Sequence, residues 1–463
     1  MAKYDVVVIG AGAAGLSAGA ILAKQGKKVL VMDRDAYLGG RGMAIPYEGY
    51  RLNLGGHLLE DSGSGITKII EYIGGKLEHG PTSKGMPVWV GDRWKPVQEL
   101  YNTDKSELKK IIQILTDIDF KEFDNYDDVP LRTWLRKYTT SEGVIALFEY
   151  ITAAEAMTEH WYDHVASDNL YVRKMHYMEK RMAGYSFWPV GGWDGMFQQM
   201  ADGVTRHGGE IWMQTTAQKL LIENGRVVGV ACEKGPRAIP NEAYNWEVVE
   251  TECVISTLPV WNVLNFVREE DLPDWYVAQI KMLAQDQFRA CWLGVYAATR
   301  EPVYTGIHPT ELAVWFGAPH SKLGGFAFLG TGYDPQIAPP GMHLFNCGFV
   351  YQGLRSPKWV EQHFDLVEQD LKTFYPGTWT DKNIVWKKRH LVAQPAFGVI
   401  QKPGLVGKYR PDYSAPNVDG LYFASETFRS RGIGVDRAAR AGLTCAERAL
   451  GRRIPEFKDS WHD

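Results

Sequence analysis

The feature that most constrains this chain is its opening stretch, DVVVIGAGAAGLSAGAILAKQGKKVLVMD, which spans residues 5–33. Residues 6–9 are a β-branched run, typical of a parallel strand buried on both faces. Three glycines with GxGxxG spacing follow, then an alanine-rich segment predicted as a helix over residues 13–25. Residues 28–32 predict a second strand. This order of strand, glycine turn, helix and strand predicts a βαβ unit that binds a dinucleotide.

Each glycine has a separate physical task in such a unit. Gly10 lets the chain turn sharply, Gly12 leaves space for a pyrophosphate beside the backbone, and Gly15 lets the helix pack closely on the sheet. Ala13 and Ala14 open the helix, whose first N–H groups point at the phosphates.

The acid at the end of the second strand predicts how the sugar is held. Asp33 lies 18 residues beyond Gly15, close to the spacing at which a carboxylate accepts hydrogen bonds from ribose hydroxyls. A carboxylate there disfavours a 2′-phosphate because like charges repel, although Arg34 beside it would offset part of that repulsion.

Length and composition limit which classes of protein this chain can belong to. A chain of 463 residues is long enough for two or three structural units. A net charge of −4 gives no basic face for nucleic acid. The five cysteines include no CxxC pair, so we expect reduced thiols and no metal site. The first strand begins within five residues of Met1 and no run of about 20 apolar residues occurs. We therefore expect a cytoplasmic protein without a signal peptide or a spanning helix.

A second glycine turn indicates which dinucleotide the chain binds. Residues 38–41 read LGGR, and this segment resembles the GGR motif of the large flavoprotein family that includes carotenoid desaturases, monoamine oxidases and protoporphyrinogen oxidase. The resemblance implies FAD, with its pyrophosphate held by Arg41 and the backbone at Gly40. A guanidinium suits a phosphate because it donates two parallel hydrogen bonds.

Two distant segments also resemble that family. The first runs from WPVGGW at residues 188–193 through a helix and an arm of strands to residue 258, and the resemblance places the backbone of Ala217 on the adenine. The second is GLYFASE at residues 420–426, followed by RGIGVD and a helix over residues 435–450. In the family its acid binds a ribityl hydroxyl. Here that acid is Glu426 rather than aspartate, and Ser425 replaces the usual glycine.

The start of the last helix is expected to face the flavin. The resemblance places Gly434 and Val435 at the pyrimidine edge, where a helix N-terminus with about half a positive charge favours the reduced ring. It also places the loop RLNLGGH, residues 51–57, over the ring, so that Gly55, Gly56 and His57 contact FAD.

The expected fold is α/β, with a discontinuous Rossmann-type FAD-binding domain and an α+β substrate domain. We assign residues 1–61, 186–260 and 405–463 to the FAD-binding domain. Residues 62–185 and 261–404 form the substrate domain, which consists of a mixed sheet and a helical cap. Aromatic and methionine side chains cluster in the cap segment, which favours an apolar cavity roofed by helices.

Several reactions are open within this resemblance. Desaturation or dehydrogenation of a C–H bond in an apolar isoprenoid or alicyclic substrate ranks first, because the WPVGGWDGMFQQMADG run is closest in style to phytoene desaturase-like proteins. Amine oxidation ranks lower, because the chain lacks the aromatic cage motif and has Arg289 where a lysine is usual. Two further functions stay open: isomerisation or reduction, and a non-enzymatic lipid carrier of the prenyl-protein GDP-dissociation-inhibitor type.

No acid–base pair is evident in the sequence. The candidate catalytic residues are His57, Tyr185, Glu155 and Arg431. The electron acceptor is left open between oxygen, a quinone and a redox protein, and peripheral membrane contact and a homodimer are left open as well.

Overall fold

The structure is a computed structural model that describes residues 3–55, 58–60, 65–100, 103–156, 164–178, 186–235, 246–394 and 396–457. For residues 60, 98, 153–156 and 186 only the backbone is described.

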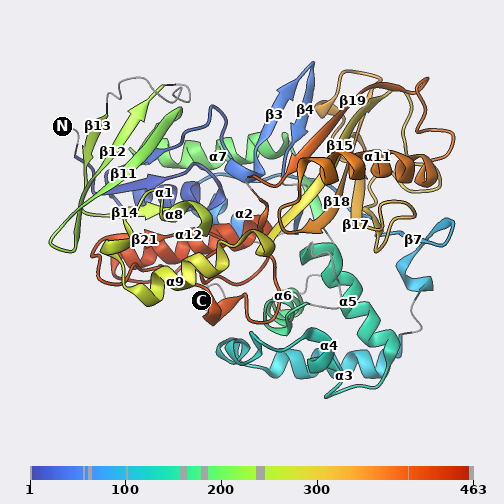
Figure 1. Cartoon of the computed structure of the whole chain (residues 1–463), viewed down its shortest axis with the longest axis horizontal. Helices are drawn as coiled ribbons and strands as arrows, with labels where there is room; N and C mark the ends of the chain where they lie inside the picture. Colours follow the sequence, from blue (N-terminus) through green and yellow to red (C-terminus); the bar gives the residue numbers. More distant parts are fainter. Residues whose placement is uncertain are drawn as a thin grey trace.

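A five-stranded parallel sheet forms the nucleotide-binding part of the molecule (Figure 1). Its strands, in spatial order, are β10 (Glu210–Trp212), β2 (Val29–Met32), β1 (Val6–Ile9), β14 (Val254–Ser256) and β21 (Leu421–Phe423). All four residues of β1 are buried, as a continuous β-branched run predicts. Three chain segments far apart in the sequence therefore build one sheet, as expected of a discontinuous Rossmann-type fold.

Helix α1 (Ala13–Lys24) packs between α7 (Gly192–Arg206) and α12 (Gly434–Leu450). A Cβ on Gly442 of α12 would lie 2.3 Å from the carbonyl oxygen of Ala14. Small residues let these helices approach closely, so the C-terminal helix rests directly on the first turn of α1.

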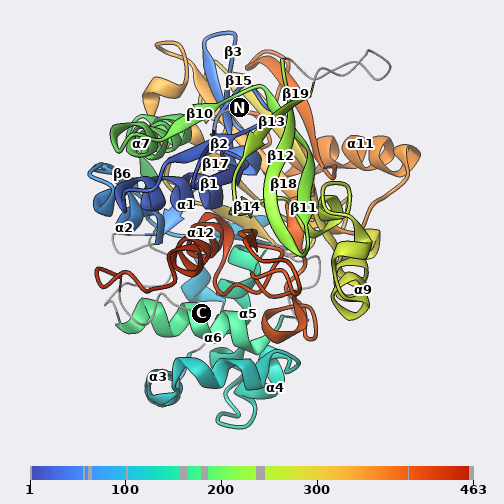
Figure 2. The ribbon, with the colours of Figure 1, turned by 90° about the vertical axis from the view of Figure 1, so that its left-hand side faces the viewer.

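An antiparallel arm extends from this sheet, made of β11 (Thr215–Glu223), β12 (Arg226–Lys234) and β13 (Glu247–Glu250). Figure 2 shows the arm face-on. Asn224 and Gly225 turn between β11 and β12 with φ of 51° and 74°, a left-handed conformation that asparagine and glycine tolerate best.

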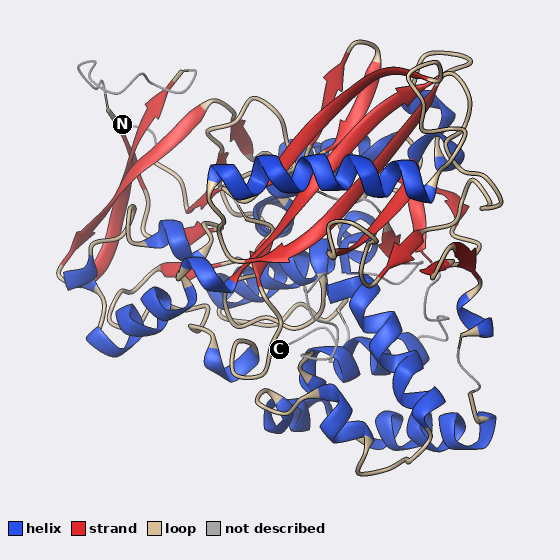
Figure 3. Ribbon diagram, turned by 45° about the vertical axis from the view of Figure 1, so that its right-hand side comes forward, coloured by secondary structure: helices blue, strands red, loops and turns tan. Residues whose placement is uncertain are grey.

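The second large sheet has eight strands. Helix α11 (Pro357–Phe374) packs on it and crosses in front of it in Figure 3. The strands of this sheet are β19 (Ile384–Val392), β15 (Arg289–Thr299), β18 (His343–Gln352), β17 (Gly324–Leu329), β16 (Ala313–Trp315), β7 (Val88–Val90), β8 (Arg93–Lys95) and β20 (Gly398–Val399). The mixed sheet predicted for the substrate domain is confirmed, because β7 and β16 pair in parallel and the other neighbours pair antiparallel. The sequence did not predict that β7 and β8, from the segment assigned to the helical cap, extend this sheet through Val88 beside Val314.

The helical cap lies below the two sheets in Figure 1. It contains α3 (Lys105–Asp117), η3 (Phe120–Tyr126), α4 (Leu131–Leu135), α5 (Glu142–Ala156) and α6 (Ala166–Met178). Residues 157–163 lie outside the described part, and the described helix α6 begins at Ala166. Residues 166–176 of α6 are buried even though they include Asp168, Arg173, Lys174 and His176.

The other described strands form a two-stranded and a three-stranded sheet, and the other α-helices are at most ten residues long. They are β3 (Ala44–Tyr47), β4 (Tyr50–Asn53), β5 (Leu59–Glu60), β6 (His79–Thr82), β9 (Ser186–Pro189), α2 (Gly65–Tyr72), α8 (Val260–Val263), α9 (Asp274–Leu283) and α10 (Gly330–Tyr333). Within the described residues, no helix is long and apolar enough to cross a membrane, and no group of three or more His, Cys, Asp or Glu side chains could hold a metal ion.

Candidate functional site

The turn between β1 and α1 can be built only with glycine. A Cβ on Gly10, where φ is 105°, would lie 2.0 Å from Thr257 Oγ1. A Cβ on Gly15 would lie 1.8 Å from the carbonyl oxygen of Gly10. The strand and the helix are thus in backbone contact, and this contact holds the first N–H groups of α1 at the end of the sheet.

The second glycine turn lies directly against the first. Gly39 N donates to Ala11 O at 2.8 Å, and Gly12 and Gly39 form a parallel bridge. A Cβ on Gly12 would meet only the backbone of Gly39 and Gly40, at 3.6–3.8 Å. The two motifs predicted to bind one pyrophosphate therefore converge, and Arg41 follows within the second of them.

Asp33 lies at the end of β2, next to the first glycine turn. Its side chain is buried, and its carboxylate accepts hydrogen bonds from Ala11 N at 2.6 Å and Asp35 N at 2.8 Å. Burial raises the pKa of Asp33, and these two hydrogen bonds oppose the rise. Thr215 N donates to the carbonyl oxygen of Asp33 at 2.7 Å, so β11, which carries Ala217, begins beside it. Arg34 is exposed next to Asp33.

Arg41 and Glu426 meet from opposite ends of the chain. Arg41 Nη1 lies 2.5 Å from Glu426 Oε1 and donates to Phe397 O at 2.9 Å. The Arg41 guanidinium also lies over the Trp261 ring, 6.0 Å from its centroid. Beneath them Arg410, whose side chain is fully buried, donates to the backbone oxygen of Glu426. The cation and the acid predicted at the cofactor are therefore neighbours, each partly exposed.

The N-terminus of α12 reaches the same region. Gly42 lies next to Val435, since a Cβ on Gly42 would be 3.7 Å from Val435 Cγ1. Gly434 has a φ of 53° and open space where a Cβ would be. The residue in the capping position is Ile433, whose side chain carries no hydrogen-bond acceptor, so it leaves the first N–H groups of α12 to another acceptor.

The glycine loop after β4 packs on the second glycine turn. A Cβ on Gly55 would lie 1.8 Å from Arg41 O, so the loop runs in backbone contact with the LGGR segment. Gly56 and His57 lie outside the described residues.

Sequence reasoning missed two side chains that hold this loop. Tyr296 Oη on β15 donates to Asn53 O, and His390 Nε2 on β19 donates to Leu54 O at 3.2 Å. Both donors come from the substrate sheet and bind consecutive carbonyl groups of the loop. No sequence motif marks them, because only strand pairing brings β15 and β19 to residues 53–54.

The position of His390 predicts a pH effect on stability. Burial lowers the pKa of His390, although its hydrogen bond to Leu54 acts in the opposite direction. The unfolded chain therefore binds this proton first as the pH falls through about 6.5, and stability is lost below that value by up to about 1.4 kcal/mol per pH unit.

We expect His390→Gln, which keeps a donor but does not titrate, to flatten the decline in unfolding free energy between pH 7.5 and pH 5.5. Urea unfolding at both pH values measures this. His320→Gln, at an exposed histidine, is the control. Equal pH dependence in wild type and His390→Gln would rule out the effect.

The four candidate catalytic residues are not brought together within the described part. His57 and Tyr185 lie outside it, and Glu155 lies in α5 without a described side chain. Arg431 is buried and pairs with Asp124, Asp127 and Asp168. Burial acts to lower the pKa of Arg431, but Asp168 and Asp127 outweigh it and the pKa is raised. The catalytic assignments stay predictions.

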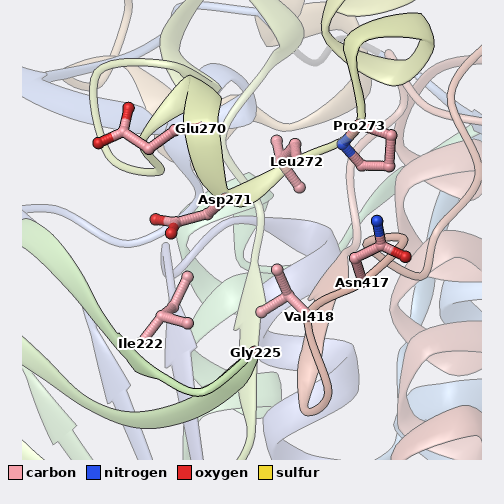
Figure 4. Close-up of a pocket in the computed structure, with 8 residues that line it drawn as sticks. All are labelled: Ile222, Gly225, Glu270, Asp271, Leu272, Pro273, Asn417 and Val418. Atoms are coloured by element: carbon pink, nitrogen blue, oxygen red, sulfur yellow. The ribbon is translucent and has the colours of Figure 1, made fainter.

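A hollow of about 290 Å³ lies beside the turn between β11 and β12 (Figure 4). It is lined by Ile222, Gly225, Glu270, Asp271, Leu272, Pro273, Asn417 and Val418. Arg268 pairs with both of its acids, at 3.4 Å from Glu270 and 2.7 Å from Asp271. None of the residues predicted to bind a nucleotide lines it, so we do not assign it to the site.

Comparison with known proteins shows which family this chain matches. The model of the flavin containing amine oxidoreductases matches residues 13–450. The chain is 23% identical to a prolycopene isomerase from Daucus carota over 96% of its length and 80% of that protein. It is 24% identical to the human all-trans-retinol 13,14-reductase over 50% of its length and 45% of that protein.

Solved structures agree on the fold. An oxidoreductase from Methanosarcina mazei has a TM-score of 0.72 at 20% identity, covering 96% of this chain and 100% of that one. A putrescine oxidase bound to putrescine has a TM-score of 0.66 at 14% identity, covering 97% and 99%. The glycine turns, the buried acid and the Arg41–Glu426 pair fit the phosphate and sugar parts of FAD. The chain therefore belongs to the family of flavin-containing amine oxidoreductases and is an FAD-dependent oxidoreductase.

Proposed function

We propose that this enzyme moves hydride between FAD and the carbon chain of an apolar isoprenoid. The observation that carries the proposal is the whole-length similarity to four prolycopene isomerases, each matched over 96% of this chain. The similarity to the retinol reductases supports the same substrate class, and an apolar cavity roofed by the helical cap is what such a substrate requires.

Dehydrogenation is the first candidate for the direction of transfer. Bound FAD supplies the acceptor position for a hydride. The chain's own residues would hold FAD: Arg41 and the glycine turns would bind its pyrophosphate, Asp33 and Glu426 would accept from its sugar hydroxyls, and the N-terminus of α12 would face its ring. The positive end of a helix in that place would favour the reduced, more negative form of the flavin.

Isomerisation or saturation of a conjugated double bond is the second candidate. The names of the relatives favour it, because they include prolycopene isomerases and a retinol reductase. Such a reaction would use the enzyme with its flavin reduced. Both candidate reactions would take place in the same site, and they differ in the redox state of the flavin that meets the substrate.

Amine oxidation is disfavoured by the residue at the start of β15. Arg289 stands there, with Nη2 at 3.0 Å from Asp286 Oδ1 and its guanidinium 5.2 Å from the centroid of Trp261. A guanidinium committed to a carboxylate and a ring is a poor substitute for the lysine that amine oxidases usually carry on this strand. We further propose that the protein is cytoplasmic and contacts membranes peripherally to collect its substrate.

Anaerobic spectroscopy separates the candidates. The oxidised holoenzyme is mixed with a partly saturated polyprene, with prolycopene and with putrescine, while the flavin band is followed. Bleaching by the polyprene is expected for dehydrogenation. Conversion of prolycopene by pre-reduced enzyme, without net flavin oxidation, is expected for isomerisation. Bleaching by the amine alone would contradict the proposal.

The same enzyme preparation can be used to identify the class of electron acceptor. In the dehydrogenation direction, reoxidation of the bleached enzyme by oxygen, a soluble quinone or a redox protein is timed, and the fastest identifies the acceptor class. Co-sedimentation with neutral lipid vesicles tests membrane contact; recovery of all the protein in the supernatant would contradict it.

A further inference from the structure

A buried cluster of charges joins the helical cap to the start of α12. It consists of Asp127, Asp168, Arg431 and Arg437, each at most 7% exposed. Arg431 Nη1 lies 2.5 Å from Asp127 Oδ1 and 3.4 Å from Asp168 Oδ1. Arg437 Nη1 lies 3.0 Å from Asp168 Oδ2. The two carboxylates belong to the cap, and the two guanidinium groups belong to residues 430–437.

Two carboxylates face two guanidinium groups in this cluster, Asp124 at its edge also pairs with Arg431, and further hydrogen bonds come from nearby groups. Arg437 Nε donates to Ser430 Oγ at 2.8 Å, and Lys408 N donates to Asp127 Oδ2 at 2.8 Å. Buried ion pairs are tolerated only when charges and hydrogen bonds are matched in this way. Because matching requires one geometry, the cluster permits one orientation of the cap, whereas two apolar faces could slide.

Helices α6 and α12 meet at two points one turn apart. Asp168 pairs with Arg437, and three residues further along each helix Tyr171 Oη accepts from Arg440 Nη1 at 3.2 Å. The Arg440 guanidinium also lies 5.7 Å from the centroid of the Tyr171 ring. These two side-chain bridges, about one turn apart on each helix, link α6 to α12.

The other side of α12 faces the nucleotide. Its Gly442 packs on Ala14 O in the first turn of α1, and its Val435 lies next to Gly42 in the turn that follows LGGR. Figures 1 and 2 both place α12 between α1 and α6. A single helix therefore contacts the phosphate-binding turns on one side and the roof of the cap on the other.

We propose that Asp168 is a positioning residue which, through Arg431 and Arg437, sets helix α6 of the cap against the flavin end of α12. Its carboxylate contacts both guanidinium groups, so it ties α6 of the cap to the first turn of α12, the helix expected to face the ring. The inference rests on FAD binding and not on the identity of the substrate.

The test uses the purified holoenzyme with Asp168→Asn, which keeps the shape of the side chain and removes its charge. We expect FAD content to be unchanged and amide hydrogen exchange in residues 166–178 to be at least about tenfold faster, because the charge match that orders the cap is lost. We also expect the flavin midpoint potential to become more positive, because the loss of one negative charge leaves Arg431 and Arg437 undercompensated at the start of α12. Asp168→Glu is expected to restore most of the potential.

The matched control breaks an exposed ion pair in the same cap. Glu142→Gln removes the partner of Arg136, at 2.8 Å and with both side chains more than half exposed. It is expected to leave exchange in α6 and the midpoint potential as in wild type. Equal exchange and equal potential in Asp168→Asn and wild type would overturn the proposal.

A second variant covers the case in which Asp168→Asn does not fold. Arg437→Lys keeps the positive charge but cannot bind Asp168 and Ser430 together. Exchange in α6 is expected to be several-fold faster, with the potential close to wild type; wild-type exchange would overturn the proposal. No readout uses a polyene, so failure of the substrate proposal and failure of this inference are distinguishable.

Discussion

The substitution Gly15→Ala is expected to yield a protein that folds without bound FAD. The new methyl group would lie 1.8 Å from the Gly10 carbonyl oxygen and 3.3 Å from Thr257 Cγ2. Backbone cannot yield as a flexible side chain does, so α1 must move away from β1 and carry its N–H groups away from the phosphates. Overpacking of this kind costs about 1–3 kcal/mol, and the displaced N–H groups add to the loss. We expect FAD affinity to fall at least about 100-fold, which is about 2.8 kcal/mol.

Titration of the apoprotein with FAD, followed by flavin fluorescence, measures this affinity. Gly195→Ala in α7 is the control, because no atom beyond its chain neighbours and the backbone of its own helix lies within 4 Å of the added Cβ, and alanine favours a helix over glycine by about 1 kcal/mol. If Gly15→Ala binds FAD as tightly as Gly195→Ala, the tight turn is not what shapes the site.

Removal of the Arg431 charge is expected to cause the largest loss of stability. In Arg431→Met, Asp127 stays fully buried without its cation and Asp168 keeps only Arg437. Breaking a buried pair by removing one partner costs about 3–5 kcal/mol, because the remaining charge is uncompensated. The free energy of unfolding, measured by urea denaturation of the holoenzyme, should fall by that amount.

The control for this loss is Arg136→Met, which removes the cation of the exposed pair with Glu142 and should cost no more than about 1 kcal/mol. If Arg431→Met keeps wild-type stability but loses turnover, the structural role is wrong and the catalytic role predicted from the sequence is favoured. If stability falls, and turnover falls only by the fraction of enzyme that unfolds, the structural role is supported.

Much of the nucleotide site could be predicted from local sequence. Three features were recognisable from their spacing: the glycines of the first turn, the acid at Asp33 and the LGGR turn. Each depends on one residue type at a fixed place within a few neighbouring positions. The convergence of Arg41 and Glu426, 385 positions apart, was predictable only because a family resemblance supplied the missing long-range information.

The sequence by itself determined the βαβ unit, because buried β-branched runs, glycines and helix formers act over distances of a few residues. Only the tertiary structure decided that β7 and β8 join the substrate sheet, that Tyr296 and His390 bind the loop at residues 53–54, and that Asp127 and Asp168 face Arg431 and Arg437. An aspartate in a helix looks solvent-exposed in a sequence. The partners of Asp168 lie 263 and 269 positions away, and its charge becomes favourable to bury only once the fold has brought those partners beside it.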